Sequence, residues 1–232
     1  MFDLGRVNVV EGLCVDVECL VLGILMNNVY IISDGKATFV VDPSCDADKI
    51  MDALNGRKCD AIIITHGHWD HIGGAADLKE MTGAETICYE DDKEWCEEGN
   101  ATGTSRKSKS VEIDRTVKHG DVIELGGMKW KVIHTPGHTK GSMCLFDIPQ
   151  HGNHPDGLPV LIAGDTLFLG STGRTDFEGG SDDDMRASIK KLAALPDDTV
   201  VLPGHRSITN IKTERRATFW RWGAEPKPDF VK

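Results

Sequence analysis

The stretch Thr65-His66-Gly67-His68-Trp69-Asp70-His71-Ile72-Gly73-Gly74 places three histidines and one aspartate within six consecutive positions. It follows directly on the apolar run Ala61-Ile62-Ile63-Ile64. A buried β-branched run followed at once by imidazole and carboxylate groups predicts a strand whose carboxyl end delivers metal ligands into a cleft. The stretch therefore predicts both a strand of the fold and part of a functional site.

Three later segments repeat this arrangement of a strand followed by a metal-binding type of side chain. They are His134-Thr135-Pro136-Gly137-His138, Ala163-Gly164-Asp165-Thr166 and Pro203-Gly204-His205. Each places a histidine or an aspartate just past a predicted strand, next to glycine or proline. A single histidine after a strand is usually structural, but its recurrence beside a His-x-His-x-Asp-His cluster favours a shared metal site.

Periodicity and turn residues predict a chain that mixes strands and helices. The segment 27–43 has two β-rich runs joined at Asp34-Gly35, so the first sheet should begin antiparallel. Further strands are expected at 7–10, 14–25, 59–65, 85–89, 121–125, 129–134, 143–146, 158–163 and 199–202, and helices at 46–54, 73–81, 184–195 and 211–222. The helix at 73–81 would place Asp70 and His71 over its positive amino-terminal pole.

Two polar segments carry weaker patterns. Residues 90–110 are charged and poor in apolar side chains, which favours a solvated helix and loop; the alternative is a flap over the cleft, contacted by Trp95. The loop 149–157 carries His151 and His154 among prolines and glycines. We expect a surface loop there, because nothing rigid would hold these histidines in a metal-binding geometry.

Composition narrows the class of protein. The chain has 232 residues, 40% hydrophobic, so a single domain over 1–232 is expected, with two small halves as the alternative and an extended tail at 223–232. The net charge of −11 argues against a nucleic-acid partner. Scattered cysteines without a Cys-x-x-Cys pair indicate a cytoplasmic protein with reduced thiols. Neither a signal peptide nor a membrane span is expected, since no apolar run approaches about 18 residues.

These motifs resemble the metallo-β-lactamase superfamily and, within it, the compact glyoxalase II-like (hydroxyacylglutathione hydrolase-like) branch. The resemblance rests on residues 65–74, 134–142, 164–168 and 203–205, and at branch level on 167–176. It implies an α+β fold, a four-layer αββα sandwich of two similar halves with a metal site at one edge between the sheets. Glyoxalase II itself has a further helical domain that grips glutathione, and the residues of that grip are not recognisable here.

The family pattern also implies a set of metal ligands. One metal would be held by His66, His68 and His138 and a second by Asp70, His71 and His205, with Asp165 bridging the two. Imidazole and carboxylate donors without thiolate suit two divalent ions, with zinc expected and iron or a mixed iron and zinc pair as alternatives. Two such ions could lower the pKa of a shared water toward about 7.

The implied activity is hydrolysis of a thioester or related acyl bond by a metal-bridging hydroxide, which Asp70 would orient besides binding metal. Two divalent ions leave the pocket positive, so a small anionic acyl substrate is expected. Lys140, Arg174 and Arg206 are the candidate substrate contacts. For Arg174, an ion pair with Asp176 that fixes the loop is the competing interpretation.

Other functions stay open on the sequence. A persulfide dioxygenase of the same superfamily would hold one iron by His66, His138 and Asp165 and consume oxygen. A metal-binding scaffold without turnover would belong to a different class. Nucleases of the superfamily need a nucleic-acid-binding surface, against which the acidic balance argues.

Overall fold

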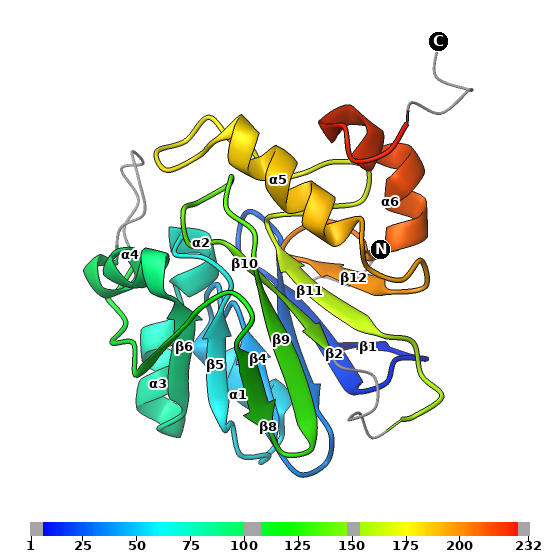
Figure 1. Cartoon of the computed structure of the whole chain (residues 1–232). Helices are drawn as coiled ribbons and strands as arrows, with labels where there is room; N and C mark the ends of the chain where they lie inside the picture. The colour runs from blue at the N-terminus through cyan, green and yellow to red at the C-terminus, as the bar shows by residue number, and fades with distance from the viewer. Residues whose placement is uncertain (1–6, 100–107, 148–153, 227–232) are drawn as a thin grey trace.

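Two β-sheets lie face to face at the centre of the computed structural model, which describes residues 7–99, 108–147 and 154–226 (Figure 1). Helices cover the outer face of each sheet, and a third apolar cluster fills the space between the sheets. The α+β fold with four αββα layers is therefore confirmed.

The first sheet contains seven strands in chain order. They are β1 (Val7–Val10), β2 (Asp16–Leu22), β3 (Asn27–Ser33), β4 (Thr38–Val41), β5 (Ala61–Ile64), β6 (Glu85–Tyr89) and β7 (Arg115–Val117). Strands β1 to β4 pair antiparallel, and β4 to β7 pair parallel. The hairpin expected at Asp34-Gly35 joins β3 to β4, and its turn is fixed because Asp34 Oδ1 accepts hydrogen bonds from the N–H groups of Lys36 and Ala37.

The second sheet has six strands in the order β13-β12-β11-β10-β9-β8. They are β8 (Val122–Leu125), β9 (Met128–His134), β10 (Met143–Asp147), β11 (Val160–Gly164), β12 (Val200–Pro203) and β13 (Thr209–Asn210). Only β11 and β12 pair parallel; the other neighbours are antiparallel. The parallel pairs β4–β5 and β11–β12 each bring two carboxyl ends to one edge of a sheet, where ligand-binding residues commonly lie.

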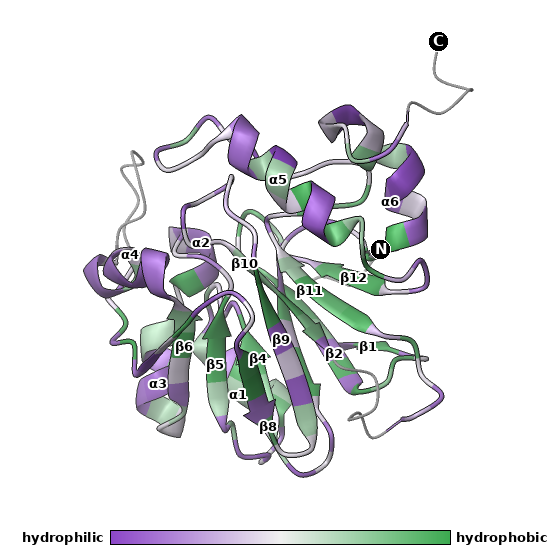
Figure 2. Cartoon of the chain, in the orientation of Figure 1, coloured by the Kyte–Doolittle hydropathy of each residue, from purple (hydrophilic) through white to green (hydrophobic). Residues whose placement is uncertain are grey.

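The longer helices on the outer faces bury apolar side chains against the sheets. The helical segments are α1 (Ala47–Leu54), α2 (Trp69–Ile72), α3 (Ala75–Thr82), η1 (Glu90–Asp92), α4 (Lys93–Glu98), α5 (Asp182–Leu192), α6 (Ile211–Ala217) and η3 (Phe219–Trp222). Ile50 and Leu78 pack on the first sheet, and Met185 and Ile189 pack on the second. Figure 2 shows the same division, with mostly hydrophobic strands and hydrophilic residues on the outward sides of α4, α5 and α6.

The core between the sheets is centred on large side chains from both. Trp130 of β9 is fully buried and meets Phe39 of β4 edge to face, with ring centroids 5.6 Å apart. Aromatic pairs in this geometry contribute about 0.5–1.5 kcal/mol beyond the burial of their area. This contact joins the two sheets at the end of β9 away from the candidate site residues, since Trp130 pairs with Asp147 and His134 pairs with Met143.

The helix expected at 73–81 is wrong at its start. Asp70 and His71 lie inside the separate short helix α2, and α3 begins only after two glycines. Gly73 packs against the loop after β4, since a Cβ there would lie 2.3 Å from the carbonyl oxygen of Ser44. The two residues therefore do not sit over the pole of a longer helix.

The carboxyl-terminal part also differs from expectation. The helix expected at 211–222 is divided into α6 and η3, because Thr218 leaves the helical region of backbone conformation. Strands β7 and β13, of three and two residues, were not expected. Residues 227–232 of the expected tail lie outside the described residues, and the single-domain interpretation stays a prediction. Among the described residues, none of the helices has the length and apolar content that crossing a membrane requires.

The contact between the sheets gives a stability prediction. Replacing Trp130 with Ala should lower the free energy of unfolding by about 3–5 kcal/mol, because it leaves a cavity where both sheets meet. Urea unfolding followed by circular dichroism measures this loss. The control Val122→Ala, at a side chain 42% exposed on β8, should change the same quantity by less than about 0.5 kcal/mol. Equal losses in the two variants would contradict the assigned core.

Candidate metal centre

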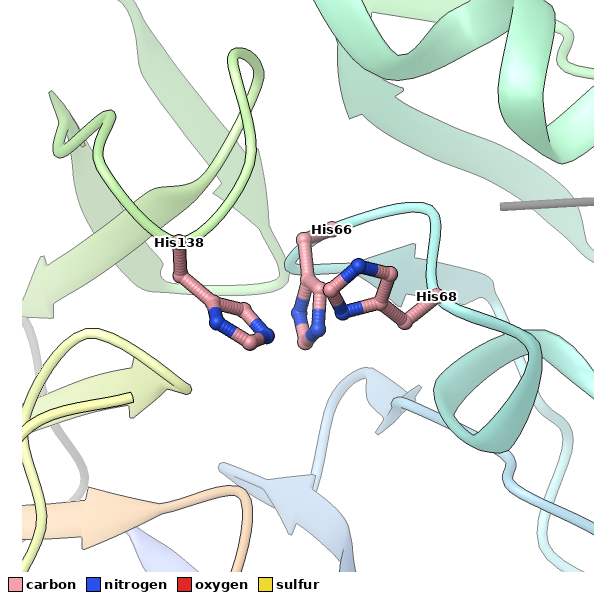
Figure 3. Close-up of side chains that lie close together, drawn as sticks. All are labelled: His66, His68 and His138. Carbon is pink, nitrogen blue, oxygen red and sulfur yellow. The ribbon is translucent and has the colours of Figure 1, made fainter. Parts of the chain in front are cut away.

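Three imidazole rings meet at the edge where the two sheets face each other. Figure 3 shows His66 and His68, from the loop after β5, pointing toward His138, from the loop between β9 and β10. Their ring centroids are 4.8 Å (His66 to His68), 4.9 Å (His66 to His138) and 4.4 Å (His68 to His138) apart. The Nε2 atoms of all three are buried and have no hydrogen-bond partner among the described residues. Converging buried nitrogens without partners fit a divalent metal ion, which would supply the missing interaction.

A second group of donors lies next to the first. His205 Nε2 is 3.3 Å from Asp70 Oδ2 and 3.3 Å from His71 Nε2. The ligand atoms of these three residues lie within 4.8 Å of one another, so a second ion would also fit. Asp70 and His71 come from α2 in the first half of the chain, and His205 follows β12 in the second half.

Asp165 lies between the two groups. Its Oδ2 atom is 3.4 Å from His138 Nε2 and its Oδ1 atom is 3.4 Å from His71 Nε2. It follows β11, whose parallel partner β12 leads into His205. The structure thus brings together all the residues that the sequence predicts as metal ligands, and it places the predicted bridging residue between the two groups.

Hydrogen bonds on the other ring nitrogen orient three of the histidines. His138 Nδ1 donates to the carbonyl of Arg174 at 2.7 Å, and His205 Nδ1 donates to the carbonyl of Leu25 at 3.1 Å. His71 Nδ1 lies 2.9 Å from a carboxylate oxygen. A proton on Nδ1 leaves Nε2 as the lone-pair nitrogen, which is the form that binds metal.

Asp42 is a functional candidate that the sequence analysis missed. Its carboxylate accepts hydrogen bonds from the backbone N–H and the hydroxyl of Thr65, at 2.7 and 2.6 Å, and lies beside Nδ1 of His71. Asp42, His66 and His71 also form a group that could hold an ion. Because Asp42 already serves Thr65 and His71, we assign it the orientation of ligands rather than metal binding. Its position directly after β4 repeats the strand-end pattern and could have revealed it.

The first residues of β3 hold the His205 loop across the two sheets. Asn27 pairs with His205 as an isolated bridge, and its Nδ2 donates to Asp70 Oδ2 at 2.9 Å. Asn28 N–H donates to the Gly204 carbonyl, and the Tyr30 hydroxyl donates to the carbonyl of Pro203, the last residue of β12, at 2.9 Å. The first residue of β3 therefore helps to set the position of His205, a donor from the second half of the chain.

Position 204 requires glycine for steric reasons. A Cβ there would lie 2.5 Å from Asp165 Oδ1 and 2.7 Å from His71 Cε1. Carbon atoms essentially never approach this closely, so a side chain would displace both donors. Close packing against Asp165 and His71 thus explains why the residue before His205 is glycine.

Burial and charge shift the pKa values of the histidines in opposite directions. Burial and the neighbouring imidazoles hold the pKa of His66 and of His68 well below the usual range, so both rings are neutral at pH 7. Burial also lowers the pKa of His71, but the carboxylates of Asp165 and Asp70 outweigh it and raise that pKa to about 10. A bound divalent ion would take the place of the His71 proton and supply the positive charge beside the carboxylates of Asp165 and Asp70.

The three candidate substrate contacts, Lys140, Arg174 and Arg206, have exposed side chains. Arg174 donates to both carboxylate oxygens of Asp176, at 2.7 and 2.6 Å, so the ion pair considered from the sequence is present. Lys140 is exposed, two residues after His138. Arg206 is also exposed, 5.8 Å from the ring of Phe168.

Two polar segments can be compared with their expected roles. Trp95 of α4 stacks on His68 with ring centroids 6.1 Å apart, but residues 100–107 lie outside the described part of the chain, so the alternative of a flap stays untested. His151 also lies outside it. His154 is exposed and pairs with Asp16 at 2.8 Å, away from the candidate ligands.

A model of the metallo-beta-lactamase superfamily matches residues 22–205. The chain belongs to this superfamily. Among curated relatives, an uncharacterized protein of Aquifex aeolicus is 36% identical over 205 residues, which cover 86% of this chain and 93% of the relative. The hydroxyacylglutathione hydrolase GloC of Haemophilus influenzae is 29% identical over 193 residues, which cover 79% of this chain and 87% of GloC.

Solved structures of the superfamily agree with this fold. The BLEG-1 B3 metallo-beta-lactamase is 29% identical, with a TM-score of 0.78 and coverage of 88% of this chain and 98% of that chain. TTHA1623, solved in a di-iron-bound form, is 29% identical, with a TM-score of 0.71 and coverage of 86% and 97%. The superfamily binds divalent metals, and the His and Asp groups described above could bind them here.

The contacts of Asp42 give a prediction for metal affinity. Asp42→Ala should weaken metal binding by about 10–100-fold, because Thr65 and His71 lose the acceptor that orients them. Competition with a chromogenic chelator measures this affinity. Asp60→Ala is the control, since Asp60 accepts a hydrogen bond from the Thr38 N–H after the same hairpin but contacts no candidate ligand. Unchanged affinity in Asp42→Ala would show that Asp42 does not orient the site.

Proposed function

We propose that this chain is a dinuclear metallohydrolase that cleaves a thioester or related acyl bond. The observation that carries the proposal is the convergence of two donor groups on Asp165, with three buried Nε2 atoms that lack a hydrogen-bond partner among the described residues. Buried polar groups without partners are costly, by about 1–3 kcal/mol each, so such a cluster is retained only where a ligand repays it. Membership of the metallo-beta-lactamase superfamily also supports the proposal of a metal-dependent hydrolase.

The donor types favour zinc in both positions, with iron as the alternative. The first group offers three imidazoles, the second offers two imidazoles and the carboxylate of Asp70, and the carboxylate of Asp165 lies beside both. None of the described cysteines joins either group. The di-iron form of TTHA1623, a structure 29% identical to this chain, supports the two-metal proposal and keeps iron in consideration. In this assignment each of the two groups would hold one ion, and Asp165 would be a ligand of both ions.

The residues of the chain divide the work of hydrolysis. Bound divalent ions would lower the pKa of a water and polarise a carbonyl oxygen. Asp70, whose Oδ2 accepts a hydrogen bond from Asn27, would orient the attacking water besides binding metal. The hydrogen bonds on Nδ1 of His138 and His205 would keep those rings from rotating during turnover.

The proposed substrate is a small anionic acyl compound, such as a hydroxyacyl thioester of glutathione. Lys140 and Arg206, which follow the candidate ligands His138 and His205 closely in the chain, would supply positive charge to this substrate in a protein of net charge −11. Arg174 would contribute less, because its charge is paired with Asp176. GloC of Haemophilus influenzae, named as a hydroxyacylglutathione hydrolase, supports this substrate class. No nucleic-acid or membrane partner is proposed.

A mononuclear iron persulfide dioxygenase is the second candidate. His138 Nε2 lies 3.4 Å from Asp165 Oδ2, so one ion could take His66, His138 and Asp165 alone. One iron per chain together with oxygen uptake would favour it. A metal-replete protein that turns over neither persulfides nor a panel of thioesters, esters and lactones would instead favour a metal-binding scaffold.

Metal content and activity on one preparation test the main proposal. After reconstitution, the wild type should bind about two metals and hydrolyse S-lactoylglutathione, whereas Asp165→Ala should bind about one or none and lose about 100-fold or more in rate. Plasma emission spectrometry and an absorbance assay provide the two numbers. Asp183→Ala, at an exposed site on α5, is the control that should keep both. If Asp165→Ala retained two metals and full activity, the bridging assignment would be wrong.

The charge of the substrate gives a separate kinetic prediction. Arg206→Ala and Lys140→Ala should each raise KM about 10-fold with little change in kcat, because a lost charge-assisted contact is worth about 1.5–3 kcal/mol. Steady-state kinetics with S-lactoylglutathione give both constants. Lys58→Ala is the control, since Lys58 precedes β5 and so lies at the other end of that strand from the site. An unchanged KM in both test variants would remove these residues from substrate binding.

A further inference from the structure

Asp92 connects the loop of His66 and His68 to the loop of His138. It ends η1 and is fully buried. Its Oδ2 atom accepts hydrogen bonds from the backbone N–H of Gly67 at 2.9 Å and from the hydroxyl of Thr139 at 2.7 Å. Gly67 stands between His66 and His68, and Thr139 directly follows His138. One carboxylate oxygen therefore binds both loops, one from each half of the fold.

The other oxygen of Asp92 strengthens this connection. Oδ1 accepts a hydrogen bond from the backbone N–H of Gly141 at 2.7 Å. A Cβ at position 141 would lie 2.6 Å from that oxygen and 2.5 Å from the backbone nitrogen of Asp92, so the His138 loop can approach only because this residue is glycine. The packing as well as the hydrogen bonds fixes the distance between the two loops.

The carboxylate of Asp92 is not used for the role that its position in the chain suggests. Asp92 is the residue before α4, and an aspartate there normally accepts a hydrogen bond from an N–H of the first helical turn. The Asp92 side chain forms no such bond. Among the described residues, the hydrogen bonds that its carboxylate accepts come from the two loops. Neither loop is adjacent to Asp92 in the chain, so this orientation is not explained by local helix capping.

We propose that Asp92 is a positioning residue that sets the separation of His66 and His68 from His138, and so the metal affinity of that group. The inference rests on the proposed metal centre. A shared acceptor opposes any movement of one loop away from the other, because separation would leave a buried carboxylate or N–H without a hydrogen-bond partner, which is unfavourable.

The second donor group is positioned by different contacts. Asp42 orients His71, Asn27 binds Asp70, and the Leu25 carbonyl binds His205. No hydrogen bond among the described residues links Asp92 to this group. A loss of Asp92 should therefore weaken one metal position and spare the other, which general destabilisation of the fold would not do.

Cobalt(II) titration of the metal-free protein tests this inference. Asp92→Asn replaces one carboxylate oxygen with an NH₂ group, which cannot accept a hydrogen bond from the N–H and O–H donors of the two loops. One of two cobalt ions should then bind about 10–100-fold more weakly in chelator competition, with a changed visible absorption spectrum, while the other keeps its affinity. Thr139→Val removes only the hydroxyl contact, should show a smaller loss at the same ion, and serves if Asp92→Asn does not fold.

Asp147→Asn is the matched control. Asp147 is also a buried aspartate, and it accepts hydrogen bonds from Cys14 Sγ and the Val160 N–H. It lies at the end of β10 away from the site. The other end of β10 is Met143, whose N–H donates to the Thr65 carbonyl beside the site. Its substitution should lower the thermal midpoint without altering cobalt affinity or spectrum.

The outcomes separate this inference from the proposed function. If wild-type protein binds two cobalt ions and Asp92→Asn and Thr139→Val bind them equally well, the positioning role is overturned alone. The same follows if Asp147→Asn weakens the same ion as much as Asp92→Asn does. Wild-type protein that binds no cobalt would overturn the proposed metal centre and this inference with it.

Discussion

The buried nitrogens of His66, His68 and His138 are the constraint on which the arrangement of this protein depends. Their Nε2 atoms lie inside the fold without a hydrogen-bond partner among the described residues, and each such atom is unfavourable for the apoprotein. A ring whose lone-pair nitrogen is buried without a partner would turn toward any available hydrogen-bond donor. The structure prevents this for His138 by a hydrogen bond on Nδ1 and holds the loops that carry all three histidines by a buried carboxylate.

The sheet topology explains why the donors meet. Parallel pairing of β4 with β5, and of β11 with β12, places two carboxyl ends side by side in each sheet. Asp42 and His66 follow the first pair, and Asp165 and His205 follow the second. Because the sheets stack with these edges together, donors from distant parts of the chain converge without a long loop, and the rigid strands limit how far they can drift.

The sequence was sufficient for the parts of the structure that have local patterns. Alternating or continuous apolar runs predicted most strands, and Asp34-Gly35 predicted the first hairpin, because strand and turn preferences act over a few residues. The candidate ligands were predicted because each follows a strand, and their spacing resembles a known family. Their convergence in space agrees with that prediction, while their binding of metal stays to be measured.

Other features could not be predicted because their causes lie far away in the chain. The separation of α2 from α3 depends on Gly73 packing against Ser44, which no periodicity within the helix reveals. Asn27 and Asp92 act through hydrogen bonds to residues far away in the chain. Asn27 donates to Asp70, 43 residues later, and Asp92 accepts from Thr139, 47 residues later. The pattern at Asp92 is that of an ordinary helix cap, so its sequence context points to a different role from the one that its contacts indicate.

The bridge between Asn27 and His205 has a further consequence for how the molecule unfolds. It joins the start of β3, in the first sheet, to the loop after β12, in the second, at the same edge as the donor groups. Ions bound there would tie the sheets together at that edge in addition to the core between them. Ligand that binds only the folded state raises its stability with concentration, so metal would make the two halves open as one cooperative unit and slow the exchange of amide hydrogens in both sheets together.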